Sequence, residues 1–222
     1  MTNSILQSID TVTDSISLRL IRLPSKHIAL FSACVAERLV GFYDAFARKH
    51  GLADKLLVRD VLDAVWQYLM NGCSAQDLRQ HLARLEEATP ASEAYDSLES
   101  ILAQNLCIVV DSAIRSSLGD QGGDSVSGEF GIELLRAAVS HAKTGFIDVG
   151  SGSGAQTFEI ELVSDPIIAS EIEFERSDLD SLESNSCIWN KLVIELKGRA
   201  ERHRLSVTSV LGTSRGGEVK DG

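Results

Sequence analysis

Residues 146–154 are the stretch whose residue types and spacing come closest to a known kind of chemistry. An apolar run leads to Asp148, and Gly150, Gly152 and Gly154 then alternate with serines. Glycines spaced in this way leave the backbone bare, so that a nucleotide-like cofactor can approach it closely. The stretch has the form of a cofactor loop, and the surrounding elements decide whether it can act as one.

A loop of the kind found in S-adenosylmethionine-dependent methyltransferases needs a strand before it, a helix after it and several further strand–helix units. Only 68 of the 222 residues follow Gly154, too few to complete such a sheet at about 30 residues per unit. The upstream sequence is helical in pattern. We therefore expect the glycines to connect two helices near 145–160, with S-adenosylmethionine or nucleotide binding by 148–154 as an alternative.

Other familiar catalytic and metal-binding patterns are missing from the sequence. The histidines show neither His-x-x-x-His nor Glu-x-x-His spacing, and the cysteines lack paired spacing. No Gly-x-Ser-x-Gly elbow follows a strand, and no Gly-x-x-x-x-Gly-Lys phosphate loop occurs. We predict no catalytic residue, no metal and no cofactor.

Four residues with polar groups lie on two successive stretches of strong helical periodicity, which begin near Pro24 and Asp54: Glu37, Arg38, Asp63 and Trp66. Glu37 and Arg38 are consecutive and point about 100° apart, whereas Asp63 and Trp66 share one face. One interpretation is a buried ion-pair network that pins the two helices, with the Trp66 indole donating to a carboxylate. The other is a ligand pocket.

The acidic charge of the chain is concentrated in one region. Its formal net charge is −11, and residues 119–190 hold 14 acids but only 3 bases. Such a protein repels nucleic-acid backbones and attracts a basic protein partner. An acidic stretch also serves solubility. The candidate partner-binding residues are the acids Glu159, Glu161, Glu171, Glu173, Glu175, Asp178, Asp180 and Glu183.

Helical signals recur along the chain and predict an all-α fold of about seven helices. Ser74 and Asp77 form a capping-box pair that starts a helix over 75–88. Asp165-Pro166 opens another helix, for which the short alternation at 171–175 is the competing strand pattern. Glycines at 119–128 predict a mobile loop.

We expect one compact helical domain at 18–204, a flexible N-terminal segment at 1–17 and a mobile tail at 205–222. No apolar run reaches the length of a membrane span, and the first residues lack the pattern of a secretory signal. These features predict a cytoplasmic protein without a membrane partner.

Several short motifs follow one another along the chain: Leu18-Arg19-Leu20 to Leu23, Phe31, Ala33-Cys34, Glu37-Arg38, Tyr43, Phe46, Asp63-x-x-Trp66 and Leu85-Glu86-Glu87-Ala88-x-Pro90. Their order resembles the YjaG-like family of bacterial all-helical proteins of unassigned function. The resemblance covers about 17–116 well and 137–144 and 165–204 faintly. It implies a compact α-helical domain inside the cell, and no reaction. The glycines near 119–128 and 146–161 depart from the family.

Three hypotheses for function follow. The preferred one is a non-enzymatic helical binding protein, such as an immunity protein, that neutralises a cationic toxin or holds another basic partner through its acidic surface. The second is the cofactor-binding enzyme based on 148–154. The third is a housekeeping helical protein that acts by self-association, as a homo-oligomer.

Overall fold

All regular secondary structure in the described part of the chain is α-helical, as predicted. The structure is a computed structural model, and it describes residues 8–52, 54–90, 97–120, 126–144, 162–184 and 188–205. These residues form one compact domain.

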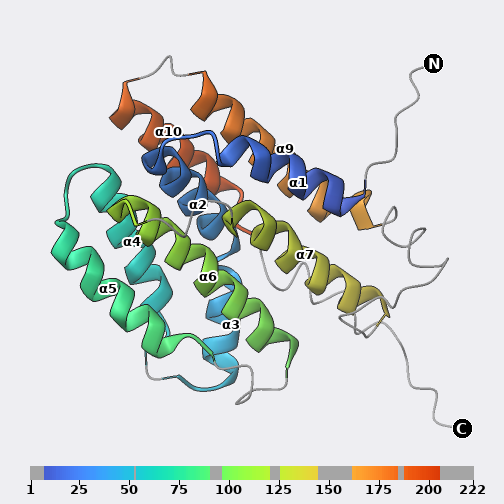
Figure 1. Cartoon of the computed structure of the whole chain (residues 1–222). Helices are drawn as coiled ribbons and strands as arrows, with labels where there is room; N and C mark the ends of the chain where they lie inside the picture. The colour runs from blue at the N-terminus through green and yellow to red at the C-terminus, as the bar shows by residue number, and fades with distance from the viewer. Residues whose placement is uncertain are drawn as a thin grey trace, which may run out of the picture.

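Nine helices are found in the described residues (Figure 1). They are α1 (Ile9–Leu20), α2 (Ser25–Leu39), α3 (Gly41–Lys49), α4 (Leu57–Leu69), α5 (Ala75–Ala88), α6 (Leu98–Leu118), α7 (Val126–Thr144), α9 (Pro166–Glu183) and α10 (Trp189–Arg202).

Helices α2 and α6 form the centre of the domain. Every residue of α2 from Ile28 to Leu39 is buried, and twelve residues of α6 are buried. They pack against each other, with α3, α4 and α5 on one side of the pair and α7 and α1 on the other. The apolar length of α6 would suit a membrane span, and its central position in the core accounts for that composition.

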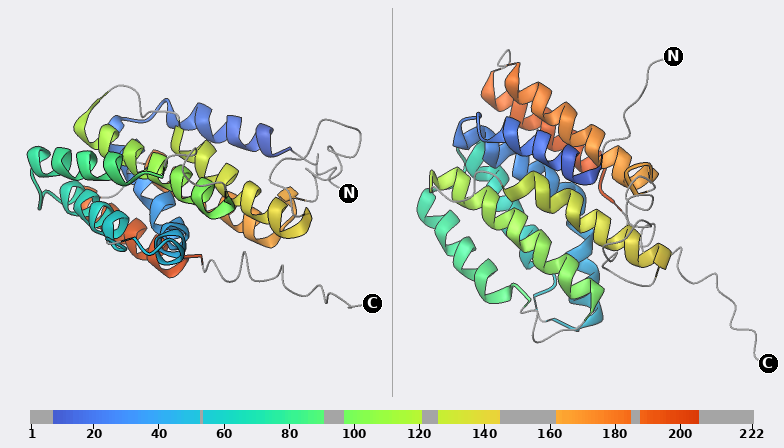
Figure 2. Two further views of the ribbon diagram at one scale, coloured as in Figure 1. Left: turned by 90° about the horizontal axis from the view of Figure 1, so that it is seen from below. Right: turned by 45° about the vertical axis from the view of Figure 1, so that its right-hand side comes forward.

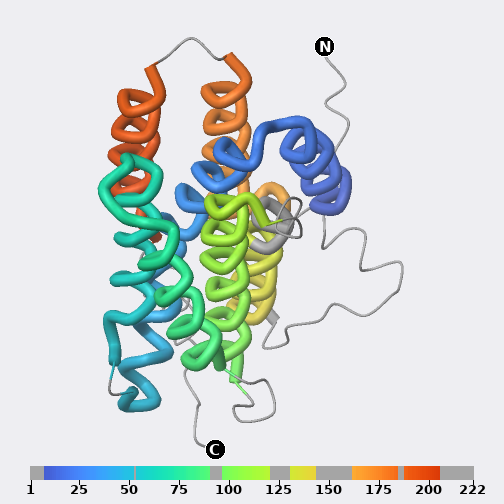
Figure 3. Tube along the Cα trace, turned by 60° about the vertical axis from the view of Figure 1, so that its left-hand side comes forward, coloured from blue at the N-terminus to red at the C-terminus, as the bar shows by residue number. Residues whose placement is uncertain are grey.

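Helices α9 and α10 complete the domain beside α2. Figure 3 shows them as neighbours at one end of the molecule, and both contact α2. The outermost helix is α5, which lies at the edge in both views of Figure 2 and buries only Leu78 and Leu85.

The helix ends follow the chemistry of their sequence. The predicted helix over 75–88 is confirmed, because Ser74 and Asp77 form the reciprocal capping box. Asp165 caps α9 by accepting from the Ile167 N–H, with Pro166 in the first turn, so the helical interpretation of this stretch is confirmed.

The prediction of about seven helices was too low. The long helix expected after Pro24 is divided at Val40, where Gly41 begins α3. The backbone carbonyl of Arg38 accepts a hydrogen bond from the Leu205 N–H at 2.8 Å, which stabilises this break. The flexible segment assigned to 1–17 was also wrong from Ile9 onwards, because the apolar stripe of α1 is buried.

Three further predictions concern the chain between and beyond these helices. The loop predicted at 119–128 is too long, because α7 begins at Val126. The glycine-rich stretch 148–154 and the tail from 206 lie outside the described residues.

Candidate functional site

Two consecutive residues of α2, Glu37 and Arg38, are the centre of the charged interior. Their exposed fractions are 0% and 1%. Because neighbours in a helix point about 100° apart, the two side chains reach different partners. Each one organises its own cluster of ion pairs.

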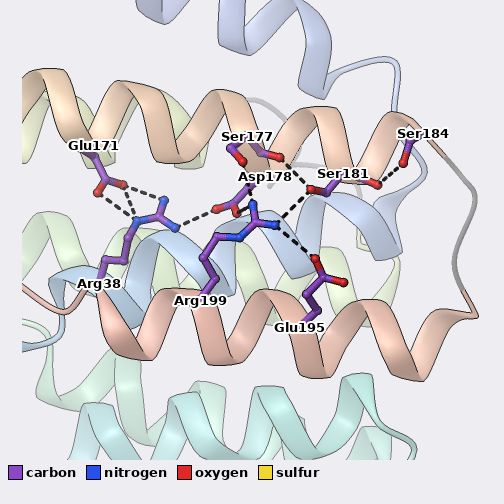
Figure 4. A network of polar contacts seen from close by, with 8 residues as sticks. All are labelled: Arg38, Glu171, Ser177, Asp178, Ser181, Ser184, Glu195 and Arg199. Atoms are coloured by element: carbon purple, nitrogen blue, oxygen red, sulfur yellow. Dashed lines mark hydrogen bonds and ion pairs between the residues drawn. The ribbon is translucent and has the colours of Figure 1, made fainter.

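The Arg38 guanidinium binds two carboxylates of α9 (Figure 4). Its Nε and Nη2 donate to Glu171 at 2.7–2.9 Å, and its Nη1 donates to Asp178 at 2.7 Å. Burial by itself disfavours the charged guanidinium, but the two carboxylates raise the pKa of Arg38 above its ordinary value. The cluster therefore holds α9 against α2 with all three groups in the core.

Arg199 extends this cluster to α10. Its Nη1 donates to Asp178 Oδ1 at 3.2 Å and to Ser177 Oγ at 2.8 Å, as Figure 4 shows. Asp178 thus accepts from an arginine on each of two helices. One buried carboxylate consequently joins α2, α9 and α10.

Glu37 has a separate set of donors. The Trp66 indole donates to Glu37 Oε2 at 2.8 Å, which is the contact suggested by the sequence. Arg59 Nη1 donates to Oε1 at 3.1 Å, and Arg204 donates to the same oxygen. Glu37 therefore ties α4 and the residues after α10 to α2.

Glu175 is the exception in this interior, because neither of its carboxyl oxygens has a hydrogen-bond partner among the described residues. Its side chain is 0% exposed and lies on α9 between Glu171 and Asp178 in sequence. Burial, together with the charge of Glu171, raises the pKa of Glu175 well above its ordinary value. This environment therefore favours the neutral carboxylic acid over the charged carboxylate at Glu175.

Three residues predicted to bind a partner are corrected by the structure: Glu171, Glu175 and Asp178 are buried. Their spacing of four and three residues places them on the inner face of α9, where Arg38 meets two of them. A protein partner therefore cannot contact them in this fold.

Other members of the predicted acidic surface are exposed. Glu173, Asp180 and Glu183 lie on the outer face of α9, and the last two bind Arg19 of α1 at 2.6–2.8 Å. Glu159 and Glu161 lie outside the described residues.

Asp63 does not join the buried clusters. Its side chain is exposed on α4, although partial burial and the nearby Glu37 charge raise its pKa. Of the four residues assigned to a network or pocket, the structure brings Glu37 and Trp66 into direct contact, and it pairs Arg38 with α9.

Sequence reasoning missed Glu175 as an unpaired acid and the arginines that complete the clusters, Arg59, Arg199 and Arg204. The available signal was Arg38 itself, a charged residue in an apolar helix that needs acids elsewhere. The spacing of Glu171, Glu175 and Asp178 supplied the matching acids. Donors on different helices carry no such spacing, because only the tertiary fold brings them together.

The paired acids of the charged interior bind donors of the protein itself. Glu37, Glu171 and Asp178 are occupied by arginines and an indole, and their side chains are at most 2% exposed. Buried ion pairs of this type specify how helices dock, and each is costly to leave half-paired. The cluster fits a structural role in holding α9 and α10.

Curated relatives share most of the chain. Uncharacterized protein YjaG of Escherichia coli (strain K12) is 27% identical over 160 residues, which cover 70% of this chain and 76% of that protein. The YjaG protein of Salmonella typhimurium gives the same identity and coverage.

A solved structure shares the fold. The crystal structure of a DUF416 family protein from Shewanella baltica OS155 superposes with a TM-score of 0.65 and covers 86% of this chain and 95% of that one, at 19% identity. The model of the family described as "Protein of unknown function (DUF416)" matches residues 15–208. The chain therefore belongs to the DUF416 family.

Proposed function

We propose that this protein is a non-enzymatic helical binding protein that holds a basic protein partner on the outer faces of α1 and α9. The observation that carries the proposal is the set of acids that remain exposed on these two contacting helices: Asp10, Asp14, Glu173, Asp180 and Glu183.

The charge of these helices supports a cationic partner. Arg19 is occupied by Asp180 and Glu183, so the acids exceed the bases that neutralise them. The chain as a whole has a net charge of −11. Complementary charge raises the rate of association and selects the sign of the partner more than it sets the final affinity.

The buried clusters support a binding role in a different way. Their ion pairs hold α9 and α10 against α2. The outer face of α9 therefore keeps a fixed position relative to the rest of the domain. Neutralisation of a basic toxin, as by an immunity protein, is one form that such a function takes.

The test is retention of proteins from the native lysate on the immobilised chain at low salt, with the product of each neighbouring gene also supplied in purified form. The triple variant Asp10→Asn, Asp14→Asn, Glu173→Gln removes exposed acids of these helices while Asp180 and Glu183, which bind Arg19, stay unchanged. We expect it to lose a basic protein that the unmodified chain retains.

A matched control removes three exposed acids elsewhere, with Asp60→Asn, Glu87→Gln and Asp120→Asn. It should retain the same protein, and about 0.5 M salt should release that protein from both forms because screening weakens exposed charge pairs. Equal loss from both variants, or no retained basic protein at low salt, would contradict the proposal.

A further inference from the structure

A cavity of about 450 Å³ lies at the end of the domain where α2 begins and α4 and α6 end. This volume is within the range of small-molecule sites. Its lining includes Ser25, Lys26, Cys73, Ser116 and Ser117. The buried clusters of Glu37 and Arg38 do not contribute to it.

The first turn of α2 presents to this cavity backbone N–H groups that donate to no other described residue. Pro24 occupies the cap position and makes no side-chain cap, while the N–H groups of His27 and Ile28 bond back to its carbonyl. The N–H groups of Ser25 and Lys26 remain at the open end of a 15-residue helix. Together with the helix dipole, such groups favour an anion.

Ser116 supplies an independent indication of a ligand. The residue is 2% exposed and lines the cavity, and its Oγ has no hydrogen-bond partner among the described residues. An unpaired buried hydroxyl costs about 1–3 kcal/mol, so native proteins rarely leave one without a partner. A bound group that accepts from this hydroxyl would satisfy it.

The two helix C-termini at the cavity are capped, so they oppose an anion less than open ends would. The Trp189 indole donates to the Leu69 carbonyl, and the Gly119 N–H donates to the Ser116 carbonyl. In the described lining the charged residue is Lys26, whose ammonium also lies over the Trp189 ring.

Asp77 lies 3.9 Å from Cys73 Sγ and is engaged in capping α5. Burial and Asp77 raise the pKa of Cys73, so its thiol is neutral at pH 7 and does not repel an anion.

We propose that this cavity binds a small organic anion, whose carboxylate or phosphate group is held by the first turn of α2 and the Lys26 ammonium. The hydroxyl of Ser116 donates to the same ligand. The remaining volume accommodates a compact body beside the half-buried Tyr68 and Leu118.

Cys73 reports occupancy of the site directly. It is half-buried in the lining, whereas Cys34 and Cys107 are buried. The rate of its alkylation by iodoacetamide is measured by peptide mass spectrometry with three matched probes: glycerol 3-phosphate, glycerate and uncharged glycerol. At about 10 mM, at least one anion should slow alkylation threefold or more, and glycerol should not.

Variants assign the protection to the proposed residues. Lys26→Met should abolish it and Lys26→Arg should restore it, while Ser116→Ala should weaken binding about tenfold through loss of a hydrogen bond to a charged group. The control Lys55→Met removes an exposed lysine from the residues before α4 and should leave protection unchanged.

Three results would overturn the proposal: no protection by either anion, equal protection by glycerol, or equal loss in Lys26→Met and Lys55→Met. Circular dichroism melting of each variant verifies that it is folded. Protection by glycerate alone identifies a carboxylate ligand, and protection by glycerol 3-phosphate alone identifies a phosphate ligand; both outcomes support the site.

Discussion

Arg38 is the residue on which the charged interior depends. Among the described residues, Arg38 is the sole hydrogen-bond donor to Glu171. Asp178 accepts from both Arg38 and Arg199. Removal of one member of a buried ion pair leaves its partner charged in the core, whereas an exposed ion pair is worth little. Helix α9 takes part in both kinds of ion pair. Its acids Glu171 and Asp178 bind Arg38 in the core, and its exposed acids bind Arg19.

We expect Arg38→Met to lower the free energy of unfolding by about 3–5 kcal/mol, because Glu171 and Asp178 remain buried without their main donor. The matched change Arg19→Met should lower it by no more than about 1 kcal/mol. Urea denaturation of both variants measures the difference. Similar losses would show that the buried pairs are no stronger than surface pairs.

Glu175 predicts a dependence of stability on pH. Its folded pKa is raised above 4.5, so the folded state holds this proton more tightly than the unfolded chain. The contribution of Glu175 to the free energy of unfolding is fully present below pH 4.5. It is lost as the pH rises towards the folded pKa, by about 1.4 kcal/mol per pH unit.

The variant Glu175→Gln should lack this loss and become progressively more stable than the unmodified protein as the pH rises from 4.5 towards the folded pKa. Denaturation across that pH range gives the difference in unfolding free energy. Glu173→Gln, an exposed change on the same helix, serves as the control. A difference that is constant with pH would mean that Glu175 is not held neutral.

At the residue scale, sequence reasoning succeeded for the partners of Trp66 and Asp165. The Trp66 indole does meet a carboxylate, and Asp165 does cap α9. It failed for Glu171 and its neighbours, because a count of acids along a segment does not distinguish the inner face of a helix from the outer one.

The approach of α7 to α2 and α9 depends on the absence of a side chain at Gly131. A Cβ there would lie 2.5 Å from Val35 Cγ1 and 3.0 Å from Glu175 Oε1. Gly198 in α10 is different, since its nearest neighbour would be the end of Arg202 at 3.5 Å. Two glycines inside helices thus have opposite roles.

Gly131→Ala should destabilise the protein by about 1–3 kcal/mol through overpacking, although alanine is the better helix former. Gly198→Ala should stabilise it by up to about 1 kcal/mol. Thermal or urea denaturation distinguishes the signs. In the double variant with Val35→Ala, the effect of Gly131→Ala should shrink, and strict additivity would argue against the contact.

At the scale of elements, local patterns predicted most helices, because capping pairs and apolar stripes lie within one helix. The division of the first long helix could not be predicted. It involves a hydrogen bond from Leu205 to the carbonyl of Arg38, and no local pattern records a partner so distant in the chain. The burial of α1 likewise depends on the neighbours α7 and α9.

The distribution of burial over the molecule predicts an order of local opening. Helix α6 is enclosed and buries twelve residues, whereas α5 lies at the edge and buries two. Hydrogen exchange by mass spectrometry should therefore show the slowest exchange in α2 and α6 and faster exchange in α5. Equal protection of α5 and α6 would indicate that the domain opens only as a whole.

At the scale of the whole molecule, the all-α class and the single domain followed from periodicity and composition. The packing arrangement did not, since α2 is covered by α4, α6 and α7 and also by α9 and α10, which follow much later in the chain. The family comparison supplies the fold and leaves the activity open, so the acidic face and the cavity at the start of α2 are the places to test.

The ion pairs of Arg38 also bear on how the protein is synthesised. Glu171 follows Arg38 by 133 residues and leaves the ribosome long after it. Until α9 has been made, the nascent chain has a central helix with an arginine in its apolar surface and no acid to bind it. We expect the early helices to stay loosely packed and open to chaperones, and the domain to close only when its last quarter emerges.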